Sequence, residues 1–398
     1  MSKRNCKVTA ILPFLLAIAP LRADSYLVNC AKGMSLQHAV DHAEPGDVIT
    51  ISGACAGPIV VTKSRLTIRG LSGSSIDGQT KDALTIQGAS NITLENLDIK
   101  GGANGIVLNA SAAASILNSA VHDNGVIGIL IEANSSATLS GGSAQHNGLN
   151  GVDVEATSSL IVTGDYLVNR NAVFGINVNG SSSVVFERAK LIVQNNVLGA
   201  QIGTSASGFI TDSSSTLAFL NNATTGLTIV SGAHMVAFGG TITSQGNGVH
   251  GVSIDSKAGL DLDAAAVLES DQNVGDGVHL EETSVMTLFN TTAFSGVPGV
   301  TTLNTHDNQG SGVGVFTGSN LTVIHQAAIQ AAHNKTGVTV DNGSSLTLVG
   351  STIKGNPTKG NPADVVLTFG SRSDITTSMI GSIECDHSVI SRGSVVCP

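Results

Sequence analysis

The sequence contains no tryptophan, only two tyrosines, Tyr26 and Tyr166, and 3% aromatic residues in all. A sugar-binding surface built on stacked aromatic rings is therefore not expected. Charged residues are also scarce, at 12%, yet 41% of the chain is hydrophobic. The chain thus has enough apolar side chains to bury a core, without the large rings that fill most globular cores.

Basic residues are few, with 19 Lys and Arg against 29 Asp and Glu. Three of them lie among the first seven residues, before an apolar run over 8–20 and a small residue at Ala23. This order is typical of a secretory signal peptide, which we predict over residues 1–23. Its removal takes away four basic residues and leaves 15 against 29, a net charge of −14. Such an acidic chain is not expected to bind nucleic acid or anionic lipid.

No later segment has the roughly 20 consecutive apolar residues that a transmembrane helix needs. The mature chain is therefore expected to be secreted, periplasmic or attached at the cell surface, with no membrane span. Cys6 leaves with the signal peptide, and the other cysteines are Cys30, Cys55, Cys385 and Cys397. An exported protein forms disulfides, and four cysteines allow three connectivities. We favour two local pairs, Cys30 with Cys55 and Cys385 with Cys397, one at each end of the chain.

Glycine, in contrast, is abundant at 47 residues, and ten glycines recur in a unit of glycine, apolar, any residue, apolar. They are Gly105, Gly128, Gly151, Gly175, Gly199, Gly226, Gly251, Gly277, Gly312 and Gly337. Their spacings run from 23 to 27 residues, apart from one of 35. Periods of this length are typical of solenoids, in which each unit buries its apolar face by stacking on the next.

The residues one and three places after each glycine are apolar in all ten units, and the residue between them is mostly polar. This alternation predicts a short strand with one face inside. A second apolar patch follows a serine-rich corner in each unit, as in Ser159 to Val162. The sequence therefore predicts an all-β, single-stranded solenoid of parallel strands, with about ten to twelve coils.

Asparagine recurs shortly before nine of these glycines, at Asn124, Asn147, Asn171, Asn196, Asn222, Asn247, Asn273, Asn308 and Asn334. Asparagine tolerates the left-handed backbone conformation of a tight corner, and its amide bonds nearby backbone groups. In stacked coils the amides are also placed to bond one another along the rod. A column that binds a ligand is the alternative interpretation.

The ends of an open solenoid need covers. Apolar residues on one face of Ser35 to Ala43, with Ser35 as N-cap, predict a short capping helix. We therefore expect a signal peptide (1–23), an N-terminal cap (24–70, with the helix at about 35–43), a parallel β-helix (71–380) and a disulfide-closed C-terminal segment (381–398).

The segments SLQHAVDHAEPGDVITISG (35–53) and IVVTKSRLTIRG (59–70) resemble the N-terminal part of right-handed parallel β-helix proteins. This superfamily includes pectate lyases and polygalacturonases, and the resemblance covers about residues 30–380. It implies a right-handed parallel β-helix. It implies no particular activity, because the fold hosts lyases, hydrolases, epimerases, phage tail fibres and adhesins.

The stretch GNGVHGVSIDS (246–256) resembles the Gly-His-Gly segment of polygalacturonases, which implies a catalytic role for His250. In that family the histidine works with carboxylates on the preceding coils, one protonating the leaving oxygen and another activating water. Neither 221–226 nor 195–199 contains a carboxylate here, and no Lys or Arg occurs over 258–334. We therefore interpret His250 as a solvated corner residue and predict no catalytic residue.

Two other enzyme families fit no better. Pectate lyases use acidic calcium ligands and an arginine base, and no arginine of the mature chain lies beside an acidic cluster in the sequence. Asn304 to Asp307 resembles the Asp-Pro-His-Asp segment of alginate epimerases, but His122 to Asn124 has the same local pattern in an ordinary corner. Neither resemblance therefore predicts an active site.

A candidate cation or ligand face lies in the acidic stretch 258–334 and the coil before it. The stretch holds eight carboxylates, and the repeat places Asp255 and Glu281 in register on neighbouring coils. The face consists of Asp255, Asp276, His279 and Glu281. Stacked carboxylates repel unless a cation or proton lies between them, and oxygen-rich clusters suit calcium. A solvated acidic face is the alternative.

Two further features stay open. A smaller acidic group consists of Glu132, Asp153 and Glu155. The 35-residue interval between Gly277 and Gly312 predicts a loop over 291–302. Insertions on one face of a solenoid often carry binding, and an accident of length is the alternative.

The sequence favours an exported, non-catalytic β-helix that acts as a scaffold or as a binding protein. A polysaccharide, a cell-surface component or cations are the expected ligands. No cofactor is predicted, and calcium is the ion that the acidic face suggests. The alternative is a calcium-assisted polysaccharide lyase or a related pectinase-like enzyme. The oligomeric state stays open.

Overall fold

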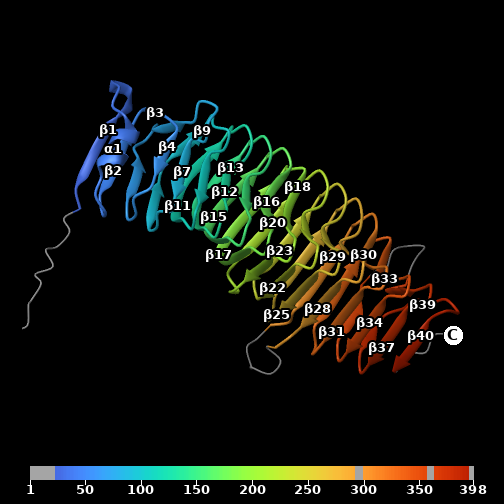
Figure 1. Ribbon diagram of the computed structural model, residues 1–398. Helices are drawn as coiled ribbons and strands as arrows, with labels where there is room; N and C mark the ends of the chain where they lie inside the picture. Colours follow the sequence, from blue (N-terminus) through green and yellow to red (C-terminus); the bar gives the residue numbers. More distant parts are fainter. Residues whose placement is uncertain (1–22, 292–298, 356–362, 394–398) are drawn as a thin grey trace, which may run out of the picture.

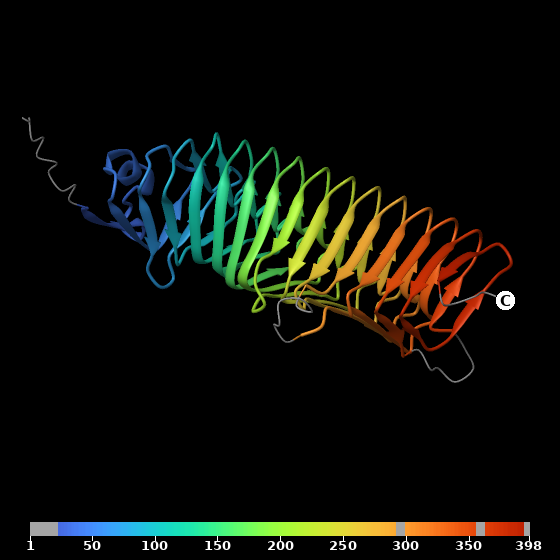
Figure 2. The same ribbon diagram turned by 90° about the horizontal axis from the view of Figure 1, so that it is seen from below.

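The computed structural model describes residues 23–291, 299–355 and 363–393. These residues form a curved rod of stacked coils, with the N-terminal cap at one end and the last strands at the other (Figure 1). Figure 2 shows the coils side by side along the rod. The paired strands run parallel, so the predicted all-β parallel β-helix is confirmed. Almost all of the predicted signal peptide lies outside the described residues.

One face of the rod is a 14-stranded sheet that takes one strand from each coil. Its strands are β4 (Ile59–Val61), β7 (Leu84–Gln87), β10 (Ile106–Asn109), β12 (Ile129–Ile131), β14 (Val152–Val154), β16 (Phe174–Val178), β18 (Leu198–Ile202), β21 (Leu227–Ile229), β24 (Val252–Ile254), β27 (Val278–Leu280), β30 (Ser311–Val315), β33 (Thr336–Val340), β36 (Val365–Leu367) and β39 (Ile383–Cys385).

The rest of each coil lies in a 26-stranded sheet made of two columns. One column holds β1 (Ser25–Asn29), β2 (Val48–Ser52), β5 (Thr67–Gly70), β8 (Ile92–Glu95), β19 (Ser207–Ile210), β22 (His234–Phe238), β25 (Gly259–Asp263), β28 (Val285–Phe289), β31 (Asn320–Ile324), β34 (Ser345–Val349), β37 (Arg372–Thr376) and β40 (Ile390–Gly393). The other holds β3 (Ala54–Ala56), β6 (Ser75–Asp77), β9 (Asp98–Lys100), β20 (Thr216–Leu220), β23 (Thr241–Gln245), β26 (Val267–Asp271), β29 (Thr302–His306), β32 (Ala328–Ala332), β35 (Thr352–Lys354) and β38 (Met379–Ile380). Four long strands run through both columns and join them: β11 (Ala113–His122), β13 (Ser136–Gln145), β15 (Ser159–Asn169) and β17 (Ser183–Gln194).

The 14 strands of the first sheet give more coils than the ten to twelve that the repeat predicted. The repeat missed four strands because another residue precedes each of them in place of glycine: Pro58, Ala83, Asp364 and Ser382. Those strands still pair in register with their neighbours, as β4 with β7 and β36 with β39 do. The apolar alternation therefore defines a coil, and the glycine is dispensable at the two ends.

The core fills the space between the sheets. All twenty residues that follow the repeat glycines by one and three places are buried, none more than 6% exposed. The side chains that follow the serine-rich corners pack against them, for example Leu160 and Val162 on β15. Phe219 is the largest of the fully buried side chains, which fits a narrow interior filled by aliphatic residues.

A ladder of buried asparagines lines one corner of the rod. The side-chain Nδ2 of each asparagine donates to Oδ1 of the next, from Asn124 to Asn334, over 2.9–3.2 Å. The backbone N–H groups donate to the same oxygens. The nine side chains are at most 3% exposed. The predicted amide ladder is confirmed, and its burial leaves no surface for the alternative, a ligand-binding column.

The left-handed residue of this corner is not the asparagine. Positive φ falls on the residue before it, as at Asp123, Asn221 and His333. The asparagine instead keeps an ordinary backbone, which directs its amide along the rod. The repeat glycine follows from the same close stacking: a Cβ at Gly128 would lie 2.5 Å from the Gly151 carbonyl oxygen and 2.7 Å from the Asn147 amide nitrogen.

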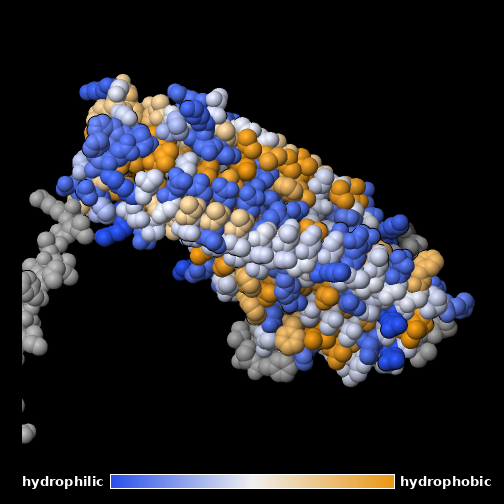
Figure 3. Space-filling model, in the orientation of Figure 1, coloured by the Kyte–Doolittle hydropathy of each residue, from blue (hydrophilic) through white to orange (hydrophobic). Residues whose placement is uncertain are grey.

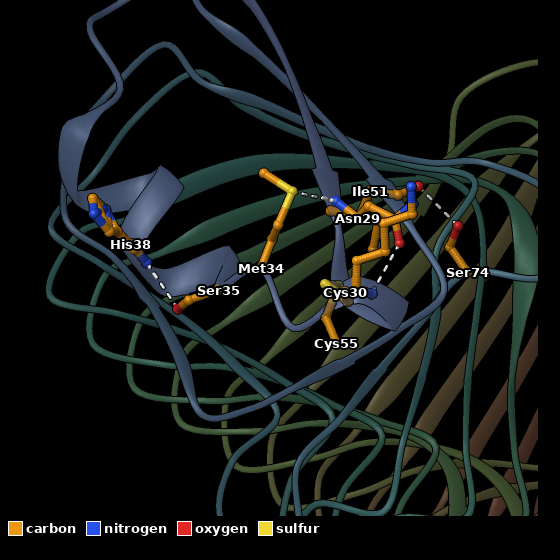
Figure 4. The surroundings of a disulfide bond; sticks show 9 residues. Asn29, Cys30, Met34, Ser35, His38, Ile51, Cys55 and Ser74 are labelled. Carbon is orange, nitrogen blue, oxygen red and sulfur yellow. Dashed lines mark hydrogen bonds between the residues drawn. A yellow bond between two sulfur atoms is a disulfide. The ribbon is translucent and has the colours of Figure 1, made fainter.

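The N-terminal cap contains α1 (Leu36–His42), whose first turn is capped by Ser35 accepting from the His38 N–H at 3.2 Å. Leu36 and Val40 on α1 are buried against the first coil. The disulfide between Cys30 and Cys55 joins a 3-10 turn, η1 (Cys30–Lys32), to β3 beside this helix (Figure 4). The first expected pair is therefore present.

Parallel pairing extends beyond the boundaries expected at residues 71 and 380. It begins with β1 and β2 and ends with β37 and β40, so the cap and the C-terminal segment each carry part of a coil. Cys385 lies on β39, and its expected partner Cys397 lies outside the described residues. So does most of the expected loop over 291–302, of which 292–298 are not described. Within the described residues, no helix is long and apolar enough to span a membrane.

We expect Asn222→Ala to lower the free energy of unfolding by about 2–4 kcal/mol, because it leaves the N–H and the side-chain amide of Asn196 buried without their acceptor. Urea denaturation followed by circular dichroism measures the change. Gln330→Ala, which removes an exposed amide on β32, is the matched control and should change it little. Equal losses in the two variants would contradict a stabilising role for the ladder.

We expect replacement of Cys30 and Cys55 by alanine to lower stability by about 3 kcal/mol, because the bond closes a loop with a sequence separation of 25. The loss should appear as a lower urea midpoint. Addition of a reducing agent should lower the midpoint of the native protein by more than that of the double variant, which keeps only the expected Cys385–Cys397 pair. A native midpoint that resists complete reduction would show that the cap does not depend on this disulfide.

Candidate functional site

The candidate face lies where β24 and β27 meet on the outer side of the 14-stranded sheet. His279 is the middle residue of β27 and points outward, because Val278 and Leu280 on either side of it are buried. Asp276 lies in the turn before β27, and Glu281 follows it directly. The alternation of the strand places His279 and Glu281 on one surface, and the turn before the strand brings Asp276 to the same surface.

His279 lies between two carboxylates. Its Nδ1 contacts Asp276 Oδ2 at 2.7 Å, and its Nε2 contacts Glu281 Oε2 at 3.3 Å. Burial lowers the pKa of His279, but the hydrogen bonds and attraction of the two carboxylates outweigh it and raise the pKa above its ordinary value. A protonated His279 therefore supplies a positive charge between the Asp276 and Glu281 carboxylates.

His250 completes the cluster from the preceding coil. Its ring stacks on His279, with centroids 4.2 Å apart and planes 18° apart. Its Nδ1 accepts the Asp276 N–H at 3.1 Å. Burial and repulsion from His279 lower the pKa of His250 to about 4. The interpretation of this residue as a solvated corner histidine is therefore wrong: the ring is half-buried and packed against its neighbour.

Asp255 does not join this cluster. Its backbone lies in register with Glu281, one coil earlier, since Ile254 pairs with Leu280. Its carboxylate, however, accepts from the neighbouring Ser256 hydroxyl at 3.3 Å, and no contact joins it to His279 or Glu281 among the described residues. The register was predicted correctly, but the Asp255 carboxylate is bonded by Ser256 and not by His279.

The smaller acidic group is built around Asp153 on β14. Its carboxylate accepts from the side-chain amides of Asn150 at 2.8 Å and Asn177 at 2.9 Å. Asp153 is 6% exposed. Burial, with a smaller contribution from Glu155, raises its pKa, and the two amide hydrogen bonds oppose the shift. The expected group of three carboxylates is therefore an amide-bound Asp153. The missed signal was the asparagine at the equivalent position of the next coil.

Ligand atoms of His250, Asp276 and His279 lie within 4.8 Å of one another, close enough to share a metal ion. The protein already satisfies these atoms, because the Asp276 N–H bonds His250 Nδ1 and the Ser311 N–H bonds Asp276 Oδ1 at 2.7 Å. The two imidazoles also make the set unlike the all-oxygen shell that calcium prefers. The arrangement is that of a buried charge network more than of a calcium site.

The His250 ring should make stability depend on pH between 6.5 and 4. Its folded pKa of about 4 lies below its ordinary 6.5, so the unfolded chain takes up a proton in this window while the folded chain stays neutral. Stability is therefore lost as the pH falls, by at most about 3 kcal/mol. His279, whose pKa is raised, changes the stability only above this pH range. Its stabilising contribution is fully present below pH 6.5 and is lost at higher pH.

Phenylalanine at position 250 keeps the ring stack and removes the titration. Urea denaturation at several pH values should therefore show a smaller loss for His250→Phe than for the native chain between pH 6.5 and 4. The carboxylates titrate in both proteins and cancel in the comparison. An equal loss of stability between pH 6.5 and 4 in both proteins would mean that the folded chain does not hold His250 in its neutral form.

Comparisons with known proteins agree with the architecture. A family model described as a right-handed beta helix region matches residues 59–224. No curated protein matches the sequence. Among solved structures, the A-module of the Azotobacter vinelandii mannuronan C-5 epimerase AlgE6 is similar, with 13% identity over 92% of this chain and 99% of that one, and a TM-score of 0.52.

Two further solved structures are more distant. The pectate lyase Pel9A has 13% identity over 61% of this chain and 76% of its own, with a TM-score of 0.45. A double mutant of the periplasmic alginate epimerase AlgG has 12% identity over 93% and 84%, with a TM-score of 0.43. At these identities the likeness shows the fold alone. Together with the coil geometry and the matched family model, the likeness to the AlgE6 module shows that the chain folds as a right-handed parallel β-helix.

Proposed function

We propose that the protein is exported and binds a neutral glycan along the outer face of the 14-stranded sheet without cleaving it. The observation that carries this proposal is a polar row at one register position of six successive strands. The polar row consists of Asp153, Asn177, Gln201, Thr228, Ser253 and His279, each paired in register with the next. At about 4.8 Å per coil, the row is about 24 Å long.

The row is ordered before any ligand arrives. Besides its bond to Asp153, Asn177 accepts through Oδ1 from the amides of Asn179 at 2.7 Å and Gln201 at 3.2 Å. Asp153 and Asn177 are buried and fix the network, while Gln201 and Thr228 are half-buried and reachable from solvent. Groups that are held in place lose less conformational entropy when a ligand binds.

The charge of the row favours an uncharged ligand. It holds a buried carboxylate, amides and hydroxyls, with His279 bound between two carboxylates at its end, and it contains no lysine or arginine. The chain without residues 1–23 has a net charge of −14, with 15 Lys and Arg against 29 Asp and Glu. Amides and hydroxyls suit the hydroxyl groups of a sugar, whereas the uronate carboxylates of pectin or alginate would be repelled.

The same register position is mostly apolar at the N-terminal end of this sheet. It holds Val60 on β4, Thr85 on β7, Val107 on β10 and Leu130 on β12. On the face shown in Figure 3, apolar residues accordingly gather over the first coils, near β4 and β12, and the surface becomes mixed toward the C-terminal end. The change from apolar to polar at Asp153 gives the row a defined beginning.

Two observations support binding without cleavage. The carboxylates nearest to His279 are both directed at its ring, whereas inverting hydrolysis needs two carboxyl groups that face a substrate bond from opposite sides. His250 directs its Nδ1 at a backbone N–H. Export is supported by the N-terminal segment and by the Cys30–Cys55 disulfide, which persists in oxidising compartments.

We expect the protein to be retarded in gels that contain a neutral glycan and to release no reducing ends from any polysaccharide, with or without calcium. Affinity electrophoresis over a panel of neutral and uronate-containing polysaccharides measures the first, and a reducing-end assay the second. Gln201→Ala combined with Thr228→Ala should weaken binding by about tenfold or more, through the loss of one hydrogen bond at each position.

The matched control removes an amide and a hydroxyl from the other sheet, by Gln330→Ala combined with Thr322→Ala. It should bind like the native protein. Equal weakening in the two double variants would place the site elsewhere. Calcium-dependent release of reducing ends would overturn the proposal in favour of a calcium-assisted polysaccharide lyase.

A further inference from the structure

A second cluster of imidazoles and carboxylates lies at the corner that follows β26, β29 and β32. Asp271 and His306 are the last residues of β26 and β29 and pair in register. Asp307 follows His306, and His333 follows β32. A ladder asparagine follows in each coil, so the four side chains lie on three successive coils beside the asparagine ladder.

The distances within this corner cluster are short. His306 Nδ1 lies 3.1 Å from Asp271 Oδ1 and 3.2 Å from Asp307 Oδ2. His333 Nδ1 lies 3.4 Å from Asp307 Oδ1. Ligand atoms of Asp271, His306 and Asp307 all lie within 4.8 Å of one another. Ligands at 2.0–2.1 Å from a tetrahedral zinc ion are about 3.3 Å apart, so the observed spacings fit such an ion without a rearrangement of the backbone.

One ligand atom of the cluster lacks a donor. Asp271 is 9% exposed, and its Oδ2 accepts from the Gln245 amide at 3.0 Å. Its Oδ1 is buried and has no hydrogen-bond partner in the described part of the chain, because the contact with His306 Nδ1 is off the hydrogen-bond direction. Asn304 Oδ1, two residues before His306, is buried without a partner as well. A buried acceptor without a donor destabilises the fold unless something else binds it.

The same corner occurs near the N-terminus with one decisive difference. There His122, Asp123 and His146 occupy the places of His306, Asp307 and His333. Lys100 pairs in register with His122, where Asp271 pairs with His306. The Lys100 ammonium binds Asp98 at 2.9 Å, and His122 contacts Asp98 and Asp123. The N-terminal corner thus contains its own cation, and the C-terminal corner has a carboxylate in that place.

No lysine or arginine in the described ranges forms an ion pair with Asp271 or Asp307. A groove of about 430 Å³ opens beside the cluster and is lined by His306, Asp307 and His333 together with Glu269 and Asn304. Glu269 is exposed and adds negative charge. A cation can therefore reach the cluster from solvent and enters a region of negative potential.

From this geometry we propose that Asp271, His306, Asp307 and His333 form a zinc-type metal site that joins three successive coils. Imidazole with carboxylate is a donor set for zinc and related transition metals, and calcium would prefer oxygen alone. Asp271 Oδ1, His306 Nδ1 and Asp307 Oδ2 are the first three ligands. His333, whose exposed ring lies 3.4 Å from Asp307 Oδ1, becomes the fourth by rotation of its side chain. The Nδ1 proton that His306 directs at Asp307 leaves for solvent when the metal binds.

The site does not depend on the proposed glycan binding, because the corner cluster and the polar row lie on different faces. It also differs from the His250 and His279 cluster. There Asp276 and both histidines already have donors or acceptors within the protein, and a metal would have to displace them.

The test is metal binding by the purified full chain after treatment with EDTA. Calorimetric titration with zinc chloride should show one site with a dissociation constant in the micromolar range or below. Cobalt(II) should give the visible absorption of a tetrahedral ion. His306→Ala should weaken zinc binding by at least about 100-fold, since even the loss of a group that only orients a ligand costs 10–100-fold. Asp271→Lys, which copies the N-terminal corner, should abolish binding and keep the fold.

Two matched variants serve as controls. His122→Ala at the N-terminal corner and His279→Ala on the candidate face should bind zinc as the native chain does, with one site. Circular dichroism before each titration identifies any variant that has not folded. Failure of the native chain to bind zinc up to millimolar metal would overturn the proposal. So would native-like binding by Asp271→Lys, or loss of binding in His122→Ala.

Discussion

The close stacking of coils at the asparagine corner is the constraint on which the other features depend. Each amide from Asn147 to Asn308 accepts two hydrogen bonds from the coil before it and donates one to the coil after it. No member can shift along the rod without leaving a buried donor unpaired, which costs a large part of the stability of a marginally stable protein. The repeat glycines follow from this spacing, because a methyl group at Gly128 would overlap both the next carbonyl and the next amide.

A fixed register has an electrostatic consequence on the surface. Residues at equal positions in neighbouring coils lie about 4.8 Å apart, so each surface carboxylate has close neighbours in its own coil and in the coils beside it. These neighbours compensate the negative charge in different ways. At Asp98 a lysine of the same strand neutralises the carboxylate. At Asp276 and Glu281 a histidine lies between the two carboxylates. At Asp153 two amides bind the buried carboxylate.

The sequence was sufficient for the fold because its strongest signals are local and repeated. The glycine and the apolar pair after it predict the strand, its inner face and the register of the next coil, and all twenty core residues are buried accordingly. The coil count was low because four strands have no glycine before them, so a search for the glycine does not find them. The left-handed residue was assigned to the asparagine, although the chain places it one residue earlier at varied side chains such as Asp123 and His146.

The candidate site could be predicted only in part, because contacts between coils depend on side-chain direction as well as on register. Asp276, His279 and Glu281 lie within six residues of one another, and they do meet. Asp255 has the right register, but its carboxylate turns to Ser256. His250 was set aside because its partners for catalysis are missing from the sequence. Its actual partner, His279, lies 29 residues later and reaches it because the turn before β24 lies beside the next strand.

The corners at His122 and His306 show how much one position decides in such a repeat. The two corners share a histidine, an aspartate and a second histidine in the same order, and the backbone around them is equivalent. Lys100, beside His122, supplies a positive charge that balances the carboxylates of the first corner. Aspartate beside His306 reverses that charge, and it leaves a buried oxygen that the described protein does not satisfy. In a solenoid, a residue that differs between equivalent positions therefore says more about ligand binding than a single motif does. The backbone is the same at both positions, so the fold does not explain the difference.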